Sequence, residues 1–214
     1  KVLNTFKAPV ITDKQTAKWG YISVANGVLT GSIANDDHVV TYRFRATTGD
    51  MKGQLTESHT LFALDAKTGD LKWKHKAQHS IRHNAIAIGD NKVLFIDKAL
   101  ATYDRSKKGK TTGPATGRLV ALDLQSGKEL WQVTDNVYGT SLAVSIPHQT
   151  VVMGYQPSRF GLASEVGGRM ASFDLKTGAS KWDKKVDYES RIIINNDTIY
   201  AQGAALDLIS GSSK

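Results

Sequence analysis

The sequence contains no cysteine, which excludes disulfide bonds, iron–sulfur clusters and zinc sites built from thiolates. Long apolar runs are also missing. The longest, such as 192–194, are strand-sized, whereas a membrane-spanning helix needs roughly 18 or more apolar residues. The first residues lack the continuous apolar core of a signal peptide, which leaves a mature or trimmed form of an exported protein possible. The 40% hydrophobic content still allows a sizeable core.

Acidic residues are outnumbered, with 20 Asp and Glu against 28 Lys and Arg, so that the net charge is +8. We interpret this surplus as a solvated surface. The alternative is attraction to an acidic polymer or an anionic membrane, which salt would weaken. The densest basic run, 105–110, lies among glycine, threonine and proline and is typical of a loop. Nucleic acid is therefore not the partner that we expect.

One sequence segment occurs three times, as LFALDAKTGDLKW, LVALDLQSGKELW and MASFDLKTGASKW, and a fourth copy begins as AALDLISG. The copies share an aspartate, a glycine and a tryptophan at constant spacing. These are Asp65, Gly69 and Trp73; Asp123, Gly127 and Trp131; Asp174, Gly178 and Trp182; and, without the tryptophan, Asp207 and Gly211. Such an internal repeat indicates a repeat architecture.

Each copy predicts a β-hairpin with a sheet-docking tryptophan. An apolar strand leads into D-x-x-[TS]-G, where the aspartate and hydroxyl side chains can bond to backbone amides and glycine supplies a positive φ. The second strand ends in a tryptophan, which is too large to hide within one small sheet. We expect it to dock on the neighbouring sheet, so the repeat aspartates and tryptophans have structural rather than catalytic roles.

A second hairpin lies between successive copies, as at Asn26-Gly27, a strong hairpin signal. Each unit then holds four short strands in meander order, and no long helical period is present. The sequence therefore predicts an all-β fold, a β-propeller of four-stranded antiparallel blades in a single domain, 1–214. The predicted blades cover about 20–76, 83–134, 140–186 and 190–214, and the last is incomplete.

The motif D-x-x-[TS]-G-x-x-x-W resembles the tryptophan-docking repeat of quinoprotein-type propellers, the PQQ-like and BamB-like repeat family of exported bacterial proteins. The resemblance covers roughly 20–211 and implies a periplasmic or otherwise exported location in the cell envelope. It also implies rings of about seven or eight blades. We therefore expect a segment of a larger ring. A small closed ring completed by residues 3–10, or an open arc that associates with another copy, remain alternatives.

Long insertions fall between the second and third strands of three blades, at about 32–59, 97–117 and 156–168. In a meander these connections share a face with the connections between blades, so we expect binding loops on that face. Aromatic residues beside arginines suit a protein or glycan partner, and plain solvated loops are the alternative. The candidate residues are Tyr42, Arg43, Arg45, His59, Tyr103, Arg105, Lys107, Lys108, Arg159 and Phe160.

Catalytic and metal-binding signals are missing. His75, His79 and His83 recur every four residues, but on a predicted strand end and connection this spacing does not align them as metal ligands. The resemblance implies that PQQ would need a vicinal cysteine pair, a stacking tryptophan and calcium. Without cysteine, and with three tryptophans committed to docking and Trp19 ahead of the first strand, we expect neither PQQ nor calcium.

The sequence thus favours a non-catalytic scaffold that binds a protein or glycan partner. The alternative is a fragment of a quinoprotein-like dehydrogenase, or of another enzyme, whose active site lies outside this chain.

Overall fold

The structure, a computed structural model, describes residues 2, 4–9, 18–34, 57–99, 117–137, 139–155 and 168–214. These residues form fourteen strands and contain no helix, so the described part of the chain has no helical segment that could cross a membrane. The strands are β1 (Trp19–Ala25), β2 (Val28–Ala34), β3 (Glu57–Asp65), β4 (Leu71–Gly89), β5 (Lys92–Lys98), β6 (Arg118–Asp123), β7 (Glu129–Val133), β8 (Ser141–Ser145), β9 (Thr150–Tyr155), β10 (Arg169–Asp174), β11 (Ser180–Lys185), β12 (Ile193–Asn195), β13 (Thr198–Ala201) and β14 (Ala204–Asp207).

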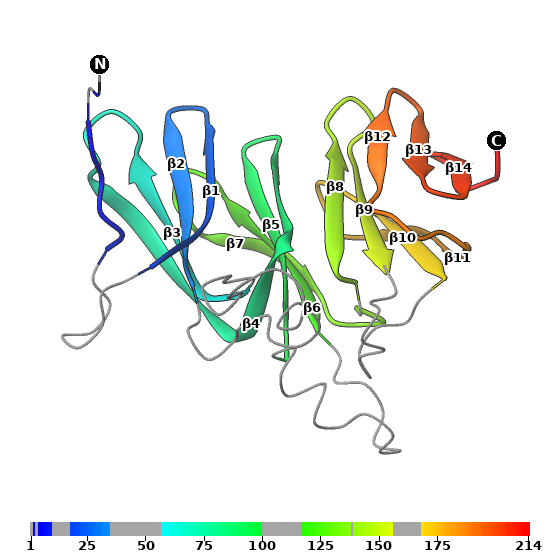
Figure 1. Cartoon of the computed structure of the whole chain (residues 1–214), viewed down its shortest axis with the longest axis horizontal. Helices are drawn as coiled ribbons and strands as arrows, with labels where there is room; N and C mark the ends of the chain where they lie inside the picture. Colours follow the sequence, from blue (N-terminus) through cyan, green and yellow to red (C-terminus); the bar gives the residue numbers. More distant parts are fainter. Residues whose placement is uncertain are drawn as a thin grey trace, which may run out of the picture.

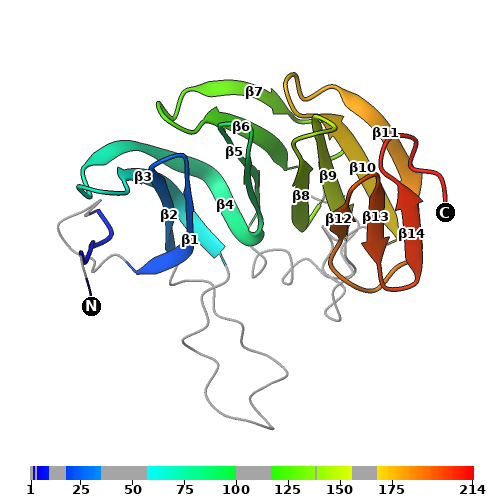
Figure 2. The same cartoon turned by 90° about the horizontal axis from the view of Figure 1, so that it is seen from above.

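The strands build antiparallel meanders, because strands adjacent in sequence are adjacent in each sheet. We call β1–β3 with the first half of β4 blade one, and the second half of β4 with β5–β7 blade two. Strands β8–β11 are blade three, and β12–β14 are blade four. The blades stand side by side in an open arc, with blades one and four at opposite ends (Figures 1 and 2). The predicted all-β propeller architecture is confirmed, and the described residues adopt the open rather than the closed arrangement.

Strand β4 differs from the sequence prediction, which expected the chain to break between the predicted blades at 20–76 and 83–134. The structure has one strand of 19 residues that leaves blade one and enters blade two. At the crossing, Ile81 lies opposite Ser58 of β3 and also opposite Asp97 of β5. Pairing on both sides keeps the connection extended, so blades one and two form one seven-stranded sheet.

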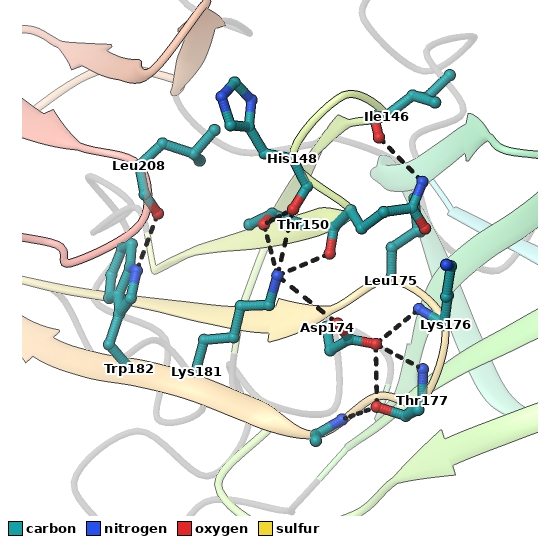
Figure 3. A network of polar contacts seen from close by, with 12 residues as sticks. Ile146, His148, Thr150, Asp174, Leu175, Lys176, Thr177, Lys181, Trp182 and Leu208 are labelled. Carbon is teal, nitrogen blue, oxygen red and sulfur yellow. Dashed lines mark hydrogen bonds and ion pairs between the residues drawn. The ribbon is translucent and has the colours of Figure 1, made fainter.

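Each repeat aspartate closes a turn at one edge of its blade. In the third copy, Oδ1 of Asp174 accepts hydrogen bonds from the amides of Lys176 and Thr177 at 3.0 Å (Figure 3). The first copy has the same geometry, and the amides of Thr68 and Lys67 hold the pKa of Asp65 below its usual value.

The residue after the aspartate forms a backbone hydrogen bond with the other hairpin turn of its blade. The amide of Leu124 donates to the carbonyl of Asn91 at 2.9 Å, and that of Leu175 donates to the carbonyl of Gln149 at 3.0 Å. In blade three, Lys181 adds bonds to the carbonyl of Gln149 at 2.8 Å and to Thr150 at 2.9 Å (Figure 3). Both kinds of turn therefore share one face, which we call the turn face.

Tryptophans join each blade to the next. The indole N–H groups of Trp73, Trp131 and Trp182 donate to the carbonyls of Leu124, Leu175 and Leu208 at 2.9, 3.2 and 3.0 Å. Each indole also lies against the glycine of the next repeat, since a Cβ added at Gly127 would lie 2.5 Å from Cγ of Trp73. Only a residue without a side chain leaves room for this contact.

Three of the four hydrophobic clusters lie between blades, and the fourth, with Phe62 and Leu64, lies on the face of blade one that points away from blade two. Between blades one and two, Trp73 packs with Leu61, Phe95 and Leu122. Equivalent clusters, which include Met153 and Ile199, fill the next two interfaces. A large apolar side chain contributes about 1.5–3 kcal/mol when it is fully buried. Since most such side chains here are buried at the interfaces between blades, each blade is stabilised mainly by its neighbours.

The contact between indole and glycine predicts that two glycines with positive φ differ in how much stability is lost when each is replaced by alanine. Gly127 has φ 70° and lies under Trp73, whereas Gly27 has φ 74° and has no atom within 4 Å of an added Cβ. Substitution G27A costs only backbone strain, about 1–2 kcal/mol. We expect G127A to destabilise by a further 1–3 kcal/mol or so, because the methyl group overlaps the indole.

Urea unfolding monitored by tryptophan fluorescence measures both variants. Equal losses of stability in G27A and G127A would show that the indole does not rest on this glycine.

Candidate functional site: the crossover face and the axial groove

The insertions leave and rejoin the sheets beside the connections between blades. At the second insertion, the amide of Gly117 donates to the carbonyl of Val137 at 3.0 Å. At the third, the amide of Val186 donates to the carbonyl of Gly168 at 2.8 Å. Val137 and Val186 both belong to blade-to-blade connections, so the insertion ends and the connections share one face. We call it the crossover face; it lies opposite the turn face (Figure 1).

Of the ten candidate loop residues, His59 alone is described. It lies on β3, is half-buried, and its Nδ1 atom is 2.8 Å from Oγ1 of Thr60. The other nine lie outside the described residues: Tyr42, Arg43, Arg45, Tyr103, Arg105, Lys107, Lys108, Arg159 and Phe160. The strands also reach further than expected, since β2 continues to Ala34 and β3 begins at Glu57.

A buried carboxylate holds the base of the second insertion. Asp97 is fully buried and accepts hydrogen bonds from the amides of Gln78 and His79, at 2.7 and 2.9 Å, where β4 crosses between blades. The guanidinium of Arg118, at the other end of the same insertion, lies 3.1 Å from Asp97. One side chain thus joins both ends of the insertion to the crossover.

Blade one carries a related ion pair at its insertion end. Glu57, the first residue of β3, is buried and lies 3.2 Å from Nε of Arg82 on β4. In blade three, Arg169 at the start of β10 pairs with Asp183 of β11. An arginine and a carboxylate therefore meet near the insertion end of each of these three blades.

Two tyrosines hold the third insertion. The hydroxyl of Tyr188 accepts the amide of Tyr155 at 2.7 Å and donates to the carbonyl of Arg169 at 2.9 Å, which joins the two insertion ends. Burial raises the pKa of Tyr188 to about 12, so the hydroxyl stays a donor at neutral pH. The Tyr155 hydroxyl donates to the carbonyl of Asn136 in the preceding connection at 2.6 Å.

A groove of about 440 Å³, which we call the axial groove, lies where the first strands of the blades meet. Its lining combines polar and apolar residues, among them Tyr21, His83, Asn84, Ser141, Arg191 and Ile192. Nε2 of His83 is 2.8 Å from Oγ of Ser58. Oγ of Ser141 is buried and has no hydrogen-bond partner among the described residues. Sequence reasoning missed this groove, because its residues come from all four blades.

The described residues do not fit a metal or a PQQ site. Within them, no three histidine, aspartate or glutamate side chains gather as a ligand set. Four residues along a strand span about 13 Å, so His75, His79 and His83 on β4 cannot share a metal. The ring of His75 instead lies 5.1 Å from Phe95, and burial lowers its pKa. The ring of Trp19 packs against Phe62 in a T-shaped contact, with 5.0 Å between the ring centroids.

The antiparallel meanders and interblade indole contacts define a propeller of tryptophan-docked repeats. The chain belongs to the family described as outer membrane protein assembly factor BamB, whose pattern it matches over residues 22–213.

Two curated relatives are dehydrogenases. The chain is 31% identical over 128 residues to the quinohemoprotein alcohol dehydrogenase ADH-IIG of Pseudomonas putida, a match covering 57% of this chain and 16% of that protein. It is 29% identical over 131 residues to the lanthanide-dependent methanol dehydrogenase of Methylacidiphilum fumariolicum, covering 57% and 19%. The matches span less than a fifth of either relative.

A solved structure agrees in fold. The crystal structure of BamB from Moraxella catarrhalis superimposes with a TM-score of 0.54 and 19% identity, covering 90% of this chain and 47% of that one. At this identity, the similarity shows the shared fold alone.

The buried pair at the second insertion predicts a large effect of a small change. Substitution D97N removes the buried carboxylate that pairs with Arg118 and leaves only the longer contact with Glu129, at 3.9 Å. We expect a loss of about 3 kcal/mol in the free energy of unfolding. The control D90N breaks the Asp90–Lys92 pair, in which the carboxylate side chain is 35% exposed. There we expect less than about 1 kcal/mol.

Urea denaturation of both variants measures these losses. A D97N variant as stable as D90N would rule out a holding role for Asp97.

Proposed function

We propose that the chain is a non-catalytic propeller scaffold that binds a protein partner through its crossover face. The observation that carries this proposal is that the insertion ends share one face, where buried side chains such as Asp97 and Tyr188 fix them to the blade connections. Membership of the BamB family supports a protein partner, since that family is described as an outer membrane protein assembly factor.

A rigid base suits loops that bind. Loops attached to a well-packed scaffold lose less conformational entropy on binding than loops on a mobile base. The candidate loops carry Tyr42, Arg43 and Arg45 in the first insertion, and Arg105 and Lys107 in the second. Arginine and tyrosine are enriched among residues that dominate protein interfaces.

We also propose that the blades, about 20–76, 83–134, 140–186 and 190–214, belong to a larger ring in the cell envelope. The BamB structure supports this, because the chain spans 47% of its length. Within such a ring, further blades of the same protein, or a second copy, are the structural partners. The periplasmic or exported location rests on the family relationship.

The face of binding can be tested by site-specific photo-crosslinking in cells that make the protein. A photoreactive amino acid placed singly at Arg45, Lys107 or Arg159 samples the insertions. The matched controls are Lys128 and Lys176, exposed residues of the turn face. We expect adducts of one defined mass from the insertion positions and none from the controls.

Protease digestion of the adduct distinguishes a protein partner from a glycan. Adducts formed only from the turn face would overturn the proposal.

A second candidate function is that the chain is a fragment of a quinoprotein-like, PQQ-dependent dehydrogenase, or of another enzyme, whose active site lies outside this chain. The observation that favours it is the similarity to two dehydrogenases, one quinohemoprotein and one lanthanide-dependent. Calorimetric titration of the complete protein, with all its blades, against PQQ in the presence of calcium or a lanthanide separates the two candidates. The scaffold proposal predicts no saturable binding, and saturable binding with one site per chain would favour the dehydrogenase.

A further inference from the structure

A histidine lies in the interface between blades one and two. His75 is on β4, opposite Leu61 of β3, and alternation along the strand places its side chain on the same face as Trp73, which packs against blade two. The centroid of its ring lies 5.1 Å from that of Phe95, a fully buried residue of β5. The imidazole therefore belongs to the packing between the two blades.

The same position in the second repeat holds a valine. His75 follows Asp65 by ten residues, and Val133 follows Asp123 by ten. Val133 packs against the cluster between blades two and three. An apolar side chain thus satisfies this position of the repeat, and the packing of the blades does not require a histidine there.

One nitrogen of His75 is buried without a partner. Its Nε2 atom has no hydrogen bond within the part of the chain that the structure describes. A neutral ring can leave this nitrogen without a proton, whereas a protonated ring must bury an N–H group that no acceptor receives. Burial therefore favours the neutral imidazole and lowers the pKa of His75.

The charged groups around the imidazole come from three strands of blade two. They are Arg118 of β6, Asp97 of β5 and Glu129 of β7. The positive charge of Arg118 lowers the pKa of His75 further, and the two carboxylates act in the opposite direction. Both carboxylates already pair with Arg118, at 3.1 and 3.9 Å. On β4 itself, Lys74 and Lys76 alternate to the other face of the sheet.

We propose that His75 makes the interface between blades one and two sensitive to acid: the blades pack tightly while the imidazole is neutral, and the packing weakens when the ring takes up a proton. The interface lies inside the chain, so further blades of a larger ring would leave it unchanged. Because Arg118 and Asp97 also hold the base of the second insertion, acid weakens that base together with the interface.

The direction of the pH effect follows from the two states of the chain. In the unfolded chain, histidine takes up a proton near its ordinary pKa of about 6.5, and the folded chain takes it up only at lower pH. Stability is therefore complete above about pH 7 and falls as the pH drops below about 6.5. The folding equilibrium constant can lose at most about tenfold for each pH unit until the folded chain also binds the proton.

Urea unfolding of the full chain at about pH 7.5 and about pH 5.5 tests the proposal with H75V, which introduces the residue of the second repeat. We expect the ratio of the wild-type to the H75V folding equilibrium constant to fall about five- to tenfold between the two pH values. Every other histidine is present in both chains, so the ratio isolates His75. Substitution H75Q removes the titrating group but keeps a polar side chain, and it should give the same change.

The matched control is H79V, the same substitution at an exposed histidine of the same strand. The ratio of the wild-type to the H79V constant should be the same at both pH values. A constant ratio for H75V and H75Q, or a change of equal size in H79V, contradicts the proposal.

Two further measurements locate the effect. NMR titration of the histidine rings should give His75 a pKa below the ordinary value, and a value at or above it contradicts the proposal. Amide exchange, corrected for its intrinsic pH dependence, should become faster in 71–77 and 118–124 of the wild type at about pH 5.5, but not in H75V. Faster exchange confined to 170–186, between blades three and four, is the opposite result.

The inference goes beyond the proposed function and can fail separately from it. Crosslinking from the crossover face at neutral pH does not depend on a charged His75. A negative result here therefore leaves the scaffold proposal standing.

Discussion

The contact between an indole ring of one blade and a glycine turn of the next is the interaction on which the arrangement depends. Each small sheet is too thin to bury its own large side chains, so its core is completed by the neighbouring sheet. The indole also fixes the orientation of one blade relative to the next. Its N–H group donates a hydrogen bond to a carbonyl of the same turn that its ring covers. Position and rotation of successive blades are thereby set together.

The two faces of the arc have different physical characters as a result. On the turn face, short D-x-x-[TS]-G turns form hydrogen bonds with the neighbouring hairpin turns, and these bonds leave little room for inserted residues. On the crossover face, buried ion pairs and tyrosine hydroxyls close the strand ends and allow long chain segments to begin there. A repeat scaffold can therefore acquire binding loops on one face without weakening the contacts between blades.

Much of the fold followed from spacing alone. The columns of aspartate, glycine and tryptophan predicted hairpins, docking and an all-β propeller, since each residue type has one dominant role in such a turn. The continuous strand β4 could not be predicted, because the residues that keep it extended, Asp97 and Glu57, are distant in sequence. The pairing of Asp97 with Arg118 follows from the antiparallel register of β5 and β6, in which the two residues lie opposite each other.

The sequence by itself determined the repeat, the local turns and the requirement that each blade pack against a neighbouring blade. These features depend on residues within a few positions of one another. Tertiary structure alone decided which side chains converge from separate blades. The axial groove, the Tyr155–Tyr188 contact and the position of His75 against Phe95 all join residues far apart in the chain. Spacing along a sequence carries no information on such distances until the sheets are packed together.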